Sequence, residues 1–370
     1  MGIMKIVYCI DSLHNPGGME RVLTTKANYL AEEYDYDVHI ALRYEDEAPF
    51  FALSPKVICH PLQARTNKEH RQSLEKLLND LRPDITISMC GAEFSFLYRI
   101  HDGSKKIAEF HFTKYYLTYL VNGILHLPLR PLHRLKAWLI QKREERNATK
   151  YDKVVLLTEQ DYHIWGEPKN MCYIHNPLSF RSNTVSPLTT KRIVAVGRLI
   201  AQKGFFYLIQ AFSLVAKEFP DWQLSIYGEG QDYEMLNNMI TANELERQVH
   251  ILPSSKNIEN VLITSSFFVF PSIYEGFGLV ITEAMECGLP CIAFDCECGP
   301  KEIIRDGDTG FLVKSKDFYG LANKMRVLMQ NGNLRTNMGQ KAKNSVSSFY
   351  PENIMPQWNN LFNELTQQNT

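Results

Sequence analysis

The sequence lacks any long hydrophobic run and any marked excess of charge of one sign. In its 370 residues, no apolar stretch approaches the length of about 18 residues that a membrane-spanning helix needs. The apolar run at residues 6–10 is too short for the core of a signal peptide, and no small-residue cleavage site follows it. The 40 Lys and Arg residues nearly balance the 41 Asp and Glu residues, which argues against a protein that binds nucleic acid over its whole surface. We therefore expect a cytoplasmic protein with no nucleic-acid partner.

Cysteine is too sparse for a disulfide framework and too irregularly spaced for a zinc site. The chain has eight cysteines, several of them inside apolar runs, as is typical of reduced, buried thiols. Four of them fall within twelve residues, at Cys287, Cys291, Cys296 and Cys298. Their spacing differs from the paired C-x2-C arrangement of structural zinc sites. We expect reduced thiols and no bound metal.

What the chain does have is a repeated alternation of short strand-like runs with helical patterns. The pattern predicts strands at residues 5–10, 38–42, 85–88, 105–110, 153–157, 193–196, 223–227, 249–251, 267–270 and 290–294. Helical segments between strands are typical of βα units in a parallel sheet. A chain of 370 residues exceeds the size of one hydrophobic core, so we expect two domains.

Residues 176–192 divide the strands into two sets. The segment is rich in Pro, Ser, Thr and Asn and has little periodicity, which indicates a linker. We place one Rossmann-like domain at residues 1–180 and a second at residues 181–345. Because open parallel sheets bind ligands at the carboxyl ends of their strands, we expect the functional residues to face a cleft between the domains.

The most informative segment, residues 267–295, is predicted to form a strand, a loop, a helix and a strand. Glu275 lies in the loop, and Glu283 follows eight residues later, in the first turns of the helix. Between them, the expected helix N-terminus contains Gly276, Phe277, Gly278 and Leu279. Backbone N–H groups at such a terminus suit an anion. A phosphate near two carboxylates indicates a nucleotide sugar, because its hydroxyl groups can donate to each glutamate.

Two cations lie in the turn after an earlier strand. Arg198 and Lys203 follow the strand expected at residues 193–196 and precede an amphipathic helix. Such cations offset the charge on a departing diphosphate without a metal ion. The alternative is that both are solvated side chains of an ordinary βα turn. A loop that begins at Gly228 has Tyr233 in place of the third glycine of the dinucleotide-binding pattern, which argues against a dehydrogenase.

Five motifs follow one another along the chain. They are GGMERVL at residues 17–23, VGRLIAQKG at 196–204, YGEG at 227–230, the E-x7-E element of Glu275 and Glu283, and GPKEIIRDGDTGFLV at 299–313. In this order they resemble the family 4 retaining glycosyltransferases, also called glycosyltransferases group 1, over nearly the whole chain. The resemblance implies an α/β protein with the GT-B fold, in which two Rossmann-like parallel-sheet domains face each other across a cleft.

The resemblance also implies a role for each matching residue in the second domain. Arg198 and Lys203 would hold the donor diphosphate, Glu275 the hydroxyl groups of the transferred sugar and Glu283 the ribose. The remaining donor-binding residues would be Ile251, beside the base, and Gly276, Phe277, Gly278 and Leu279.

In the first domain the resemblance points to Gly17, Gly18 and His111. The two glycines would let the backbone approach the donor phosphates, and the alternative is a simple turn. His111 follows the strand expected at residues 105–110 and resembles the active-site histidine of the family. It would hydrogen-bond to the donor sugar or the acceptor, and the alternative is a structural histidine.

The resemblance implies an acceptor domain at residues 1–180, a donor domain at 181–345 and a C-terminal helix at 346–370 that packs back toward the first domain. The expected enzyme is a metal-independent, retaining hexosyltransferase that needs no cofactor. It would move a hexose or N-acetylhexosamine from a nucleotide sugar, expected to be UDP-linked, to a lipid-linked or polysaccharide acceptor in the synthesis of a surface glycan such as lipopolysaccharide or capsule. The alternatives are a UDP-sugar 2-epimerase of the same fold and a non-catalytic subunit for glycan assembly.

Residues 111–150 carry eight Lys or Arg residues and two acids. Aromatic and aliphatic residues are interleaved with these charges, at Tyr115, Tyr116, Leu117, Tyr119, Leu120, Ile124, Leu125, Leu127 and Trp138. The mixture suits the interface of an anionic membrane and predicts peripheral attachment at the inner face of the cytoplasmic membrane. The alternative is an amphipathic helix that packs its apolar face on the first domain.

Overall fold

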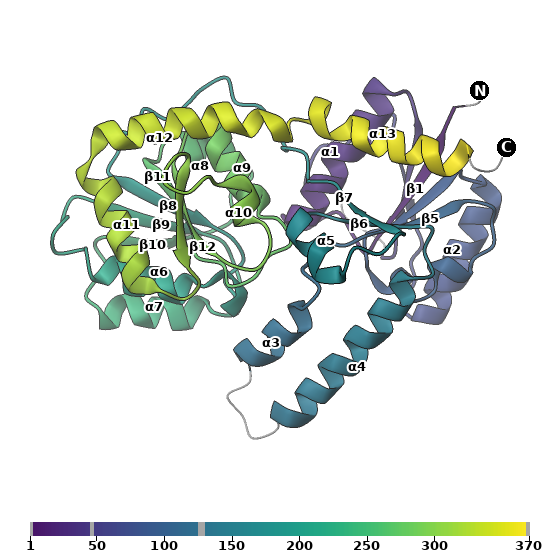
Figure 1. Cartoon of the computed structure of the whole chain (residues 1–370), viewed down its shortest axis with the longest axis horizontal. Helices are drawn as coiled ribbons and strands as arrows, with labels where there is room; N and C mark the ends of the chain where they lie inside the picture. Colours follow the sequence, from purple (N-terminus) through teal and green to yellow (C-terminus); the bar gives the residue numbers. More distant parts are fainter. Residues whose placement is uncertain (1–2, 45–47, 125–129, 368–370) are drawn as a thin grey trace. The chain divides into compact units, whose positions relative to one another are not determined.

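The computed structural model describes residues 3–44, 48–124 and 130–367, and the chain forms two compact units (Figure 1). Unit 1 comprises Met1–Tyr115, Arg134–Ser179 and Phe349–Thr370, and unit 2 comprises Tyr116–His133 and Phe180–Ser348. Two segments therefore depart from a single division near residue 180. Tyr116–His133 has its contacts with unit 2, and Phe349–Thr370 has its contacts with unit 1.

Within the described residues, unit 1 contains a seven-stranded parallel sheet in the order β3-β2-β1-β4-β5-β6-β7. Its strands are β1 (Lys5–Ile10), β2 (Asp37–Leu42), β3 (Ile58–Pro61), β4 (Ile85–Ser88), β5 (Lys105–Glu109), β6 (Lys153–Leu156) and β7 (Met171–Tyr173). The central strand β1 is apolar and buried continuously from Ile6 to Ile10. This composition favours a parallel sheet that is covered on both faces.

The helices of unit 1 include α13, the last helix of the chain. They are α1 (Gly18–Glu33), α2 (Asn67–Leu81), most of α4 (Arg130–Ala148), α5 (Glu159–Trp165) and α13 (Pro351–Gln367), with the short η1 (Ala92–Ser95) and η2 (Leu97–Arg99); η4 (Val346–Phe349) precedes α13. α13 packs on α1 and buries Trp358 and Phe362 in the core of this unit. The Tyr36 hydroxyl donates a hydrogen bond to the Asn359 side chain. The C-terminal helix is thus part of the packing of unit 1.

Within the described residues, unit 2 contains a six-stranded parallel sheet in the order β10-β9-β8-β11-β12-β13. The strands are β8 (Arg192–Val196), β9 (Gln223–Tyr227), β10 (Val249–Leu252), β11 (Phe267–Phe270), β12 (Cys291–Asp295) and β13 (Gly310–Lys314). Its helices are α3 (Tyr116–Ile124), η3 (Ala201–Lys203), α6 (Phe205–Ser213), α7 (Tyr233–Ala242), α8 (Ile258–Ile263), α9 (Leu279–Glu286), α10 (Pro300–Ile303), α11 (Phe318–Gln330) and α12 (Gly332–Ser345). Two parallel α/β units confirm the expected fold class.

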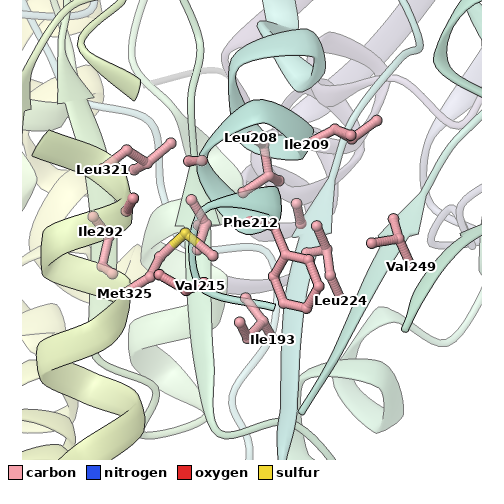
Figure 2. Packing of buried hydrophobic residues seen from close by; sticks show 14 of the residues in the cluster. Ile193, Leu208, Ile209, Phe212, Val215, Leu224, Val249, Ile292, Leu321 and Met325 are labelled. Carbon is pink, nitrogen blue, oxygen red and sulfur yellow. The ribbon is translucent and has the colours of Figure 1, made fainter. Parts of the chain in front are cut away.

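The core of unit 2 holds β8 beside β11. Figure 2 shows Leu208 and Phe212 of α6 directed toward Ile193 of β8 and Leu224 of β9, and all four side chains are fully buried. Residues 267 and 268 of β11 pair with residues 193 and 194 of β8. Because the two strands are parallel neighbours, the loops that follow them leave the same edge of the sheet. These loops carry Lys203 and Glu275.

Candidate active site

Lys203 and Glu275 form an ion pair in unit 2. Lys203 ends η3, in the connection after β8, and its Nζ donates a 2.6 Å hydrogen bond to Glu275 Oε1 in the loop after β11. The two side chains are 16% and 10% exposed. The same ammonium group lies 5.2 Å from the ring centroid of Phe270. From the sequence we assign these residues to different parts of a donor, and the structure brings their side chains into direct contact.

Gly204 lets the loop after β8 approach the loop after β11. Its φ is +64°, and a Cβ at this position would lie 2.0 Å from the carbonyl oxygen of Pro271. Next to this contact, the Gln202 side chain donates a hydrogen bond to the Tyr274 carbonyl oxygen at 2.9 Å, and the Ile273 N–H donates to the Gln202 carbonyl oxygen at 2.8 Å. The backbone thus fixes the positions of Lys203 and Glu275.

Gly204→Ala is expected to destabilise unit 2 by roughly 1–3 kcal/mol, because it adds a backbone clash to the strain of a left-handed residue. Gly307→Ala is the matched control, since Gly307 has a φ of +75° but no atom within 4 Å of its added Cβ. Thermal unfolding should show a clearly larger loss of Tm for the Gly204 variant. Equal losses would mean that the contact with Pro271 is unimportant.

Arg198 lies beside the same pair. It follows β8, its side chain is exposed, and among the described residues no hydrogen bond or ion pair engages its guanidinium group. Burial raises the pKa of the neighbouring Tyr274, the Glu275 carboxylate raises this pKa further, and the Arg198 cation opposes the increase. Arg198, Tyr274 and Glu275 therefore interact electrostatically, and Arg198 is accessible to an anion.

The other expected donor-binding residues lie in the same unit. Gly278 has a φ of +100° and precedes α9 as its N-cap, so a left-handed glycine starts the helix where we expect it, at Leu279. Gly276 and Phe277 are buried in the loop, and Ile251 is half-buried on β10. Glu283 is only 1% exposed, on α9. Its carboxylate is thus buried within the unit.

Two residues near this site, Tyr274 and Glu297, were not singled out in the sequence, and a third, Tyr119, was assigned to a different role. The ring of Tyr119, on α3, stacks on the ring of Tyr274 with centroids 5.3 Å apart and an interplanar angle of 14°. The Tyr119 hydroxyl donates a hydrogen bond to the Glu297 carboxylate. Tyr274 could have been noticed because it directly precedes Glu275, whereas no local pattern links Tyr119 to a loop about 150 residues away. From the sequence we group Tyr119 with the membrane-facing aromatic residues, but the structure packs it in unit 2.

In unit 1, Gly17 and Gly18 begin α1 without positive φ angles. Gly17 is the N-cap with a φ of −80°, and Gly18 is not among the residues with positive φ. A Cβ on Gly18 would meet no atom within 4 Å, whereas one on Gly17 would meet the Glu20 side chain. The conformation of the backbone therefore does not itself require glycine at either position.

His111 follows β5 in the same unit and is neutral at pH 7. Its side chain is 7% exposed, and its Nε2 lies 3.4 Å from Glu109 Oε1. Burial lowers the pKa of His111 to about 4, and the Lys26 cation lowers it while the Glu109 carboxylate opposes the decrease. A neutral imidazole has one donor and one acceptor nitrogen.

The cysteines singled out above are all free thiols. Cys287, Cys291 and Cys298 are fully buried, and Cys296 is nearly so. Burial raises the pKa of Cys287, Cys291 and Cys296. Among the described residues, no group of three or more His, Cys, Asp or Glu side chains is arranged to hold a metal ion.

Sequence and structure comparisons relate the chain to glycosyltransferases. The family model described as "Glycosyl transferases group 1" matches residues 179–345. An uncharacterized glycosyltransferase of Haemophilus influenzae is 30% identical over 369 residues, covering 96% of this chain and 99% of the relative. The amylovoran biosynthesis glycosyltransferase AmsD of Erwinia amylovora is 27% identical over 369 residues, covering 97% of this chain and 99% of that protein.

A solved structure shows the same fold. A mutant of TarM from S. aureus, in complex with fondaparinux, alpha-GlcNAc-glycerol and UDP, has a TM-score of 0.82 to this chain at 17% sequence identity. The match covers 98% of this chain and 100% of that chain. The similarity to a glycosyltransferase at 30% identity covers nearly the whole chain, the family model matches the second half, and the two-sheet architecture is shared with a solved structure. The chain therefore belongs to the glycosyltransferases of group 1 and has the GT-B fold.

Proposed function

We propose that this glycosyltransferase is a retaining, metal-independent hexosyltransferase that moves a hexose or N-acetylhexosamine from a UDP-sugar to a lipid-linked or polysaccharide acceptor in surface glycan synthesis. The observation that carries the proposal is the Lys203–Glu275 pair beside the exposed Arg198. The bound UDP of the TarM complex and the role of AmsD in amylovoran biosynthesis support the donor and the acceptor class.

When a UDP-sugar binds and separates the two members of the ion pair, it gives each of them a new partner. Its diphosphate replaces the Glu275 carboxylate as the partner of Lys203, and its sugar hydroxyls replace the ammonium group as donors to Glu275. Arg198 adds a second cation at the diphosphate. The bond between the sugar and UDP breaks, and the leaving phosphate takes the proton of the acceptor hydroxyl as the new glycosidic bond forms on the same face. The two cations offset the charge that develops on UDP.

Glu283 and Ile251 have proposed roles at the nucleoside, at the ribose and the base respectively. Gly276, Phe277, Gly278 and Leu279 provide the backbone beside the phosphates, and Gly17 and Gly18 do so from unit 1. His111 hydrogen-bonds to the donor sugar or to the acceptor.

Thermal unfolding with a panel of nucleotide sugars tests the donor. A UDP-sugar at 100 times its Kd should stabilise the protein by about 2.7 kcal/mol, and GDP- and ADP-sugars at the same concentration should stabilise it less. The anomeric configuration of the glycan product, measured by NMR, then tests retention. Stabilisation only by GDP- or ADP-sugars would contradict the UDP assignment, and an inverted product would contradict the retaining mechanism.

The two alternatives have their own tests. Conversion of UDP-GlcNAc to its 2-epimer without any acceptor would identify a UDP-sugar 2-epimerase. Failure to bind any nucleotide sugar in calorimetry would identify a non-catalytic subunit.

We further propose that α4 attaches the enzyme to an anionic membrane. α4 extends away from the sheet of unit 1 (Figure 1), and its exposed large apolar side chains are Leu132, Leu135, Trp138 and Leu139. The next turns expose Lys142, Arg143 and Arg146. Apolar residues beside basic ones suit the lipid interface. Leu125 and Leu127 lie outside the described residues, and none of the described helices has both the length and the apolar character to cross a membrane.

Replacing Arg134, Lys136, Lys142 and Arg143 with Glu should release the protein from anionic vesicles. Each basic residue near such a surface contributes roughly 1 kcal/mol. The measurement is co-sedimentation at low salt with phosphatidylcholine vesicles that do or do not contain phosphatidylglycerol. The control carries the same reversal at Arg65, Lys68, Arg71 and Lys76, in and just before α2 of the same unit. Equal binding by the α4 variant and the control variant would contradict attachment through α4.

A further inference from the structure

A buried charged cluster joins α1, β5 and α13 in unit 1. Lys26 of α1 is fully buried, and its Nζ donates a hydrogen bond of 2.5 Å to Glu109 Oε2 at the end of β5. The same Nζ lies 3.5 Å from the ring centroid of Trp358 on α13 and 5.4 Å from that of Tyr8 on β1. Two aromatic faces and one carboxylate thus surround the ammonium group, with His111 on the other side of that carboxylate.

The second carboxylate oxygen of Glu109 and the nearer ring nitrogen of His111 lie close together without forming a hydrogen bond. Glu109 Oε1 and His111 Nε2 are both buried, and neither has a hydrogen-bond partner among the described residues. They lie 3.4 Å apart. Buried polar atoms without partners are costly, and a hydrogen bond between these two atoms would satisfy both. A small rotation of the imidazole would let Nε2 donate to Oε1.

This contact selects one form of His111. A lone pair on Nε2 would face a carboxylate oxygen and be repelled, whereas an N–H group there would be attracted. Protonation of both nitrogens is disfavoured by burial and by the nearby Lys26 cation. The form that remains carries its proton on Nε2 and a free lone pair on Nδ1.

We propose that Glu109, held in place by Lys26, is a positioning residue that keeps the proton of the neutral His111 on Nε2 and leaves Nδ1 to accept a hydrogen bond from a hydroxyl group of the donor sugar or of the acceptor substrate. The inference rests on the proposed function for the identity of the ligand, but not for the protonation state of His111. Trp358 extends the arrangement to the C-terminal helix, because its ring covers the ammonium group that holds Glu109. The alternative is that Lys26 and Glu109 only stabilise the packing of unit 1.

NMR of the full chain with ¹⁵N-labelled histidine tests the protonation state independently of activity. His111→Gln identifies the His111 signal by its loss. In the unmodified protein we expect a protonated Nε2 and an unprotonated Nδ1 at pH 7, and no titration of His111 above about pH 5, since its pKa is about 4. A protonated Nδ1 would overturn the proposal whether or not the protein transfers a sugar.

Two substitutions test how the cluster acts on His111. Glu109→Gln should remove the preference for the Nε2 proton and lower kcat by about 10–100-fold, the scale for losing a group that orients a functional histidine. Lys26→Met removes a cation that lowers the pKa of His111 and leaves the Glu109 carboxylate that raises it. The pKa of His111 should therefore rise. When the solution is acidified, activity should disappear at a higher pH than in the unmodified protein. Tyr8 and Trp358, the other two side chains of the cluster, are uncharged at pH 7 and below.

Two further variants separate positioning from stability. Tyr36→Phe removes the hydrogen bond to Asn359 of α13 without changing a charge in the cluster, and it should leave the His111 spectrum and the pH profile unchanged. The Lys26→Met, Glu109→Gln double variant has no buried charge at these positions, so it addresses the case in which a single variant fails to fold. It should fold and still lack the Nε2 preference. A double variant with the His111 spectrum and activity of the unmodified protein would overturn the proposal.

Discussion

Replacing Glu275 with alanine is expected to lower kcat for sugar transfer by about 10³-fold or more, because the sugar hydroxyl groups would lose their buried hydrogen-bond acceptor. UDP should still bind, because the carboxylate is proposed to contact the sugar and not the nucleotide. The measurements are steady-state transfer with a UDP-sugar and calorimetry with UDP alone.

The control for Glu275→Ala is Glu218→Ala in the same unit. Glu218 also accepts from a cation, with Arg326 Nη2 at 2.8 Å from its Oε1, but this pair lies on the exposed surface. Exposed pairs contribute little to stability, so the control should keep full activity. Full turnover by Glu275→Ala, or a loss in the control of the same size, would exclude the proposed role of Glu275.

Arg198→Ala and Lys203→Ala should each lower kcat by about 10²–10³-fold, the scale for losing one preorganised group that stabilises developing charge. Lys191→Ala is the matched control, because Lys191 pairs with Asp221 at 2.8 Å on the exposed surface of the same unit. EDTA should have almost no effect on the unmodified enzyme. Inhibition by EDTA that Mn²⁺ or Mg²⁺ reverses would show that the two cations are not sufficient.

The direct contact of Lys203 with Glu275 predicts that their substitutions are not additive. Residues in contact share an interaction that each single variant already removes. Lys203→Ala combined with Glu275→Ala should therefore lose less activity than the product of the two single losses. Fully multiplicative losses would mean that the 2.6 Å contact has no part in the site.

Local patterns in the sequence were sufficient to predict most central strands and the start of the helix after Glu275. β8 and β11 lie where their apolar runs predict them, because a strand covered on both faces has a nearly continuous apolar sequence. β3, β7 and β13 were missed. All three are edge strands of their sheets, and β3 and β7 bury at most one residue each, so the sequences of these two lack the continuous apolar run of a strand covered on both faces.

Neighbouring residues are enough to predict the alternation of strands and helices, the motifs that place the chain in its family, and the position of Arg198, Lys203 and Glu275 in loops after strands. Which of these loops meet depends on how the strands are ordered in the folded sheet. Lys203 pairs with Glu275 because β11 lies beside β8 in the sheet. Lys26 reaches Glu109 across 83 residues, and Trp358 covers that pair. Such contacts depend on strand order and helix packing, which are set by the burial of apolar surface across the whole unit and leave no periodic pattern in the sequence.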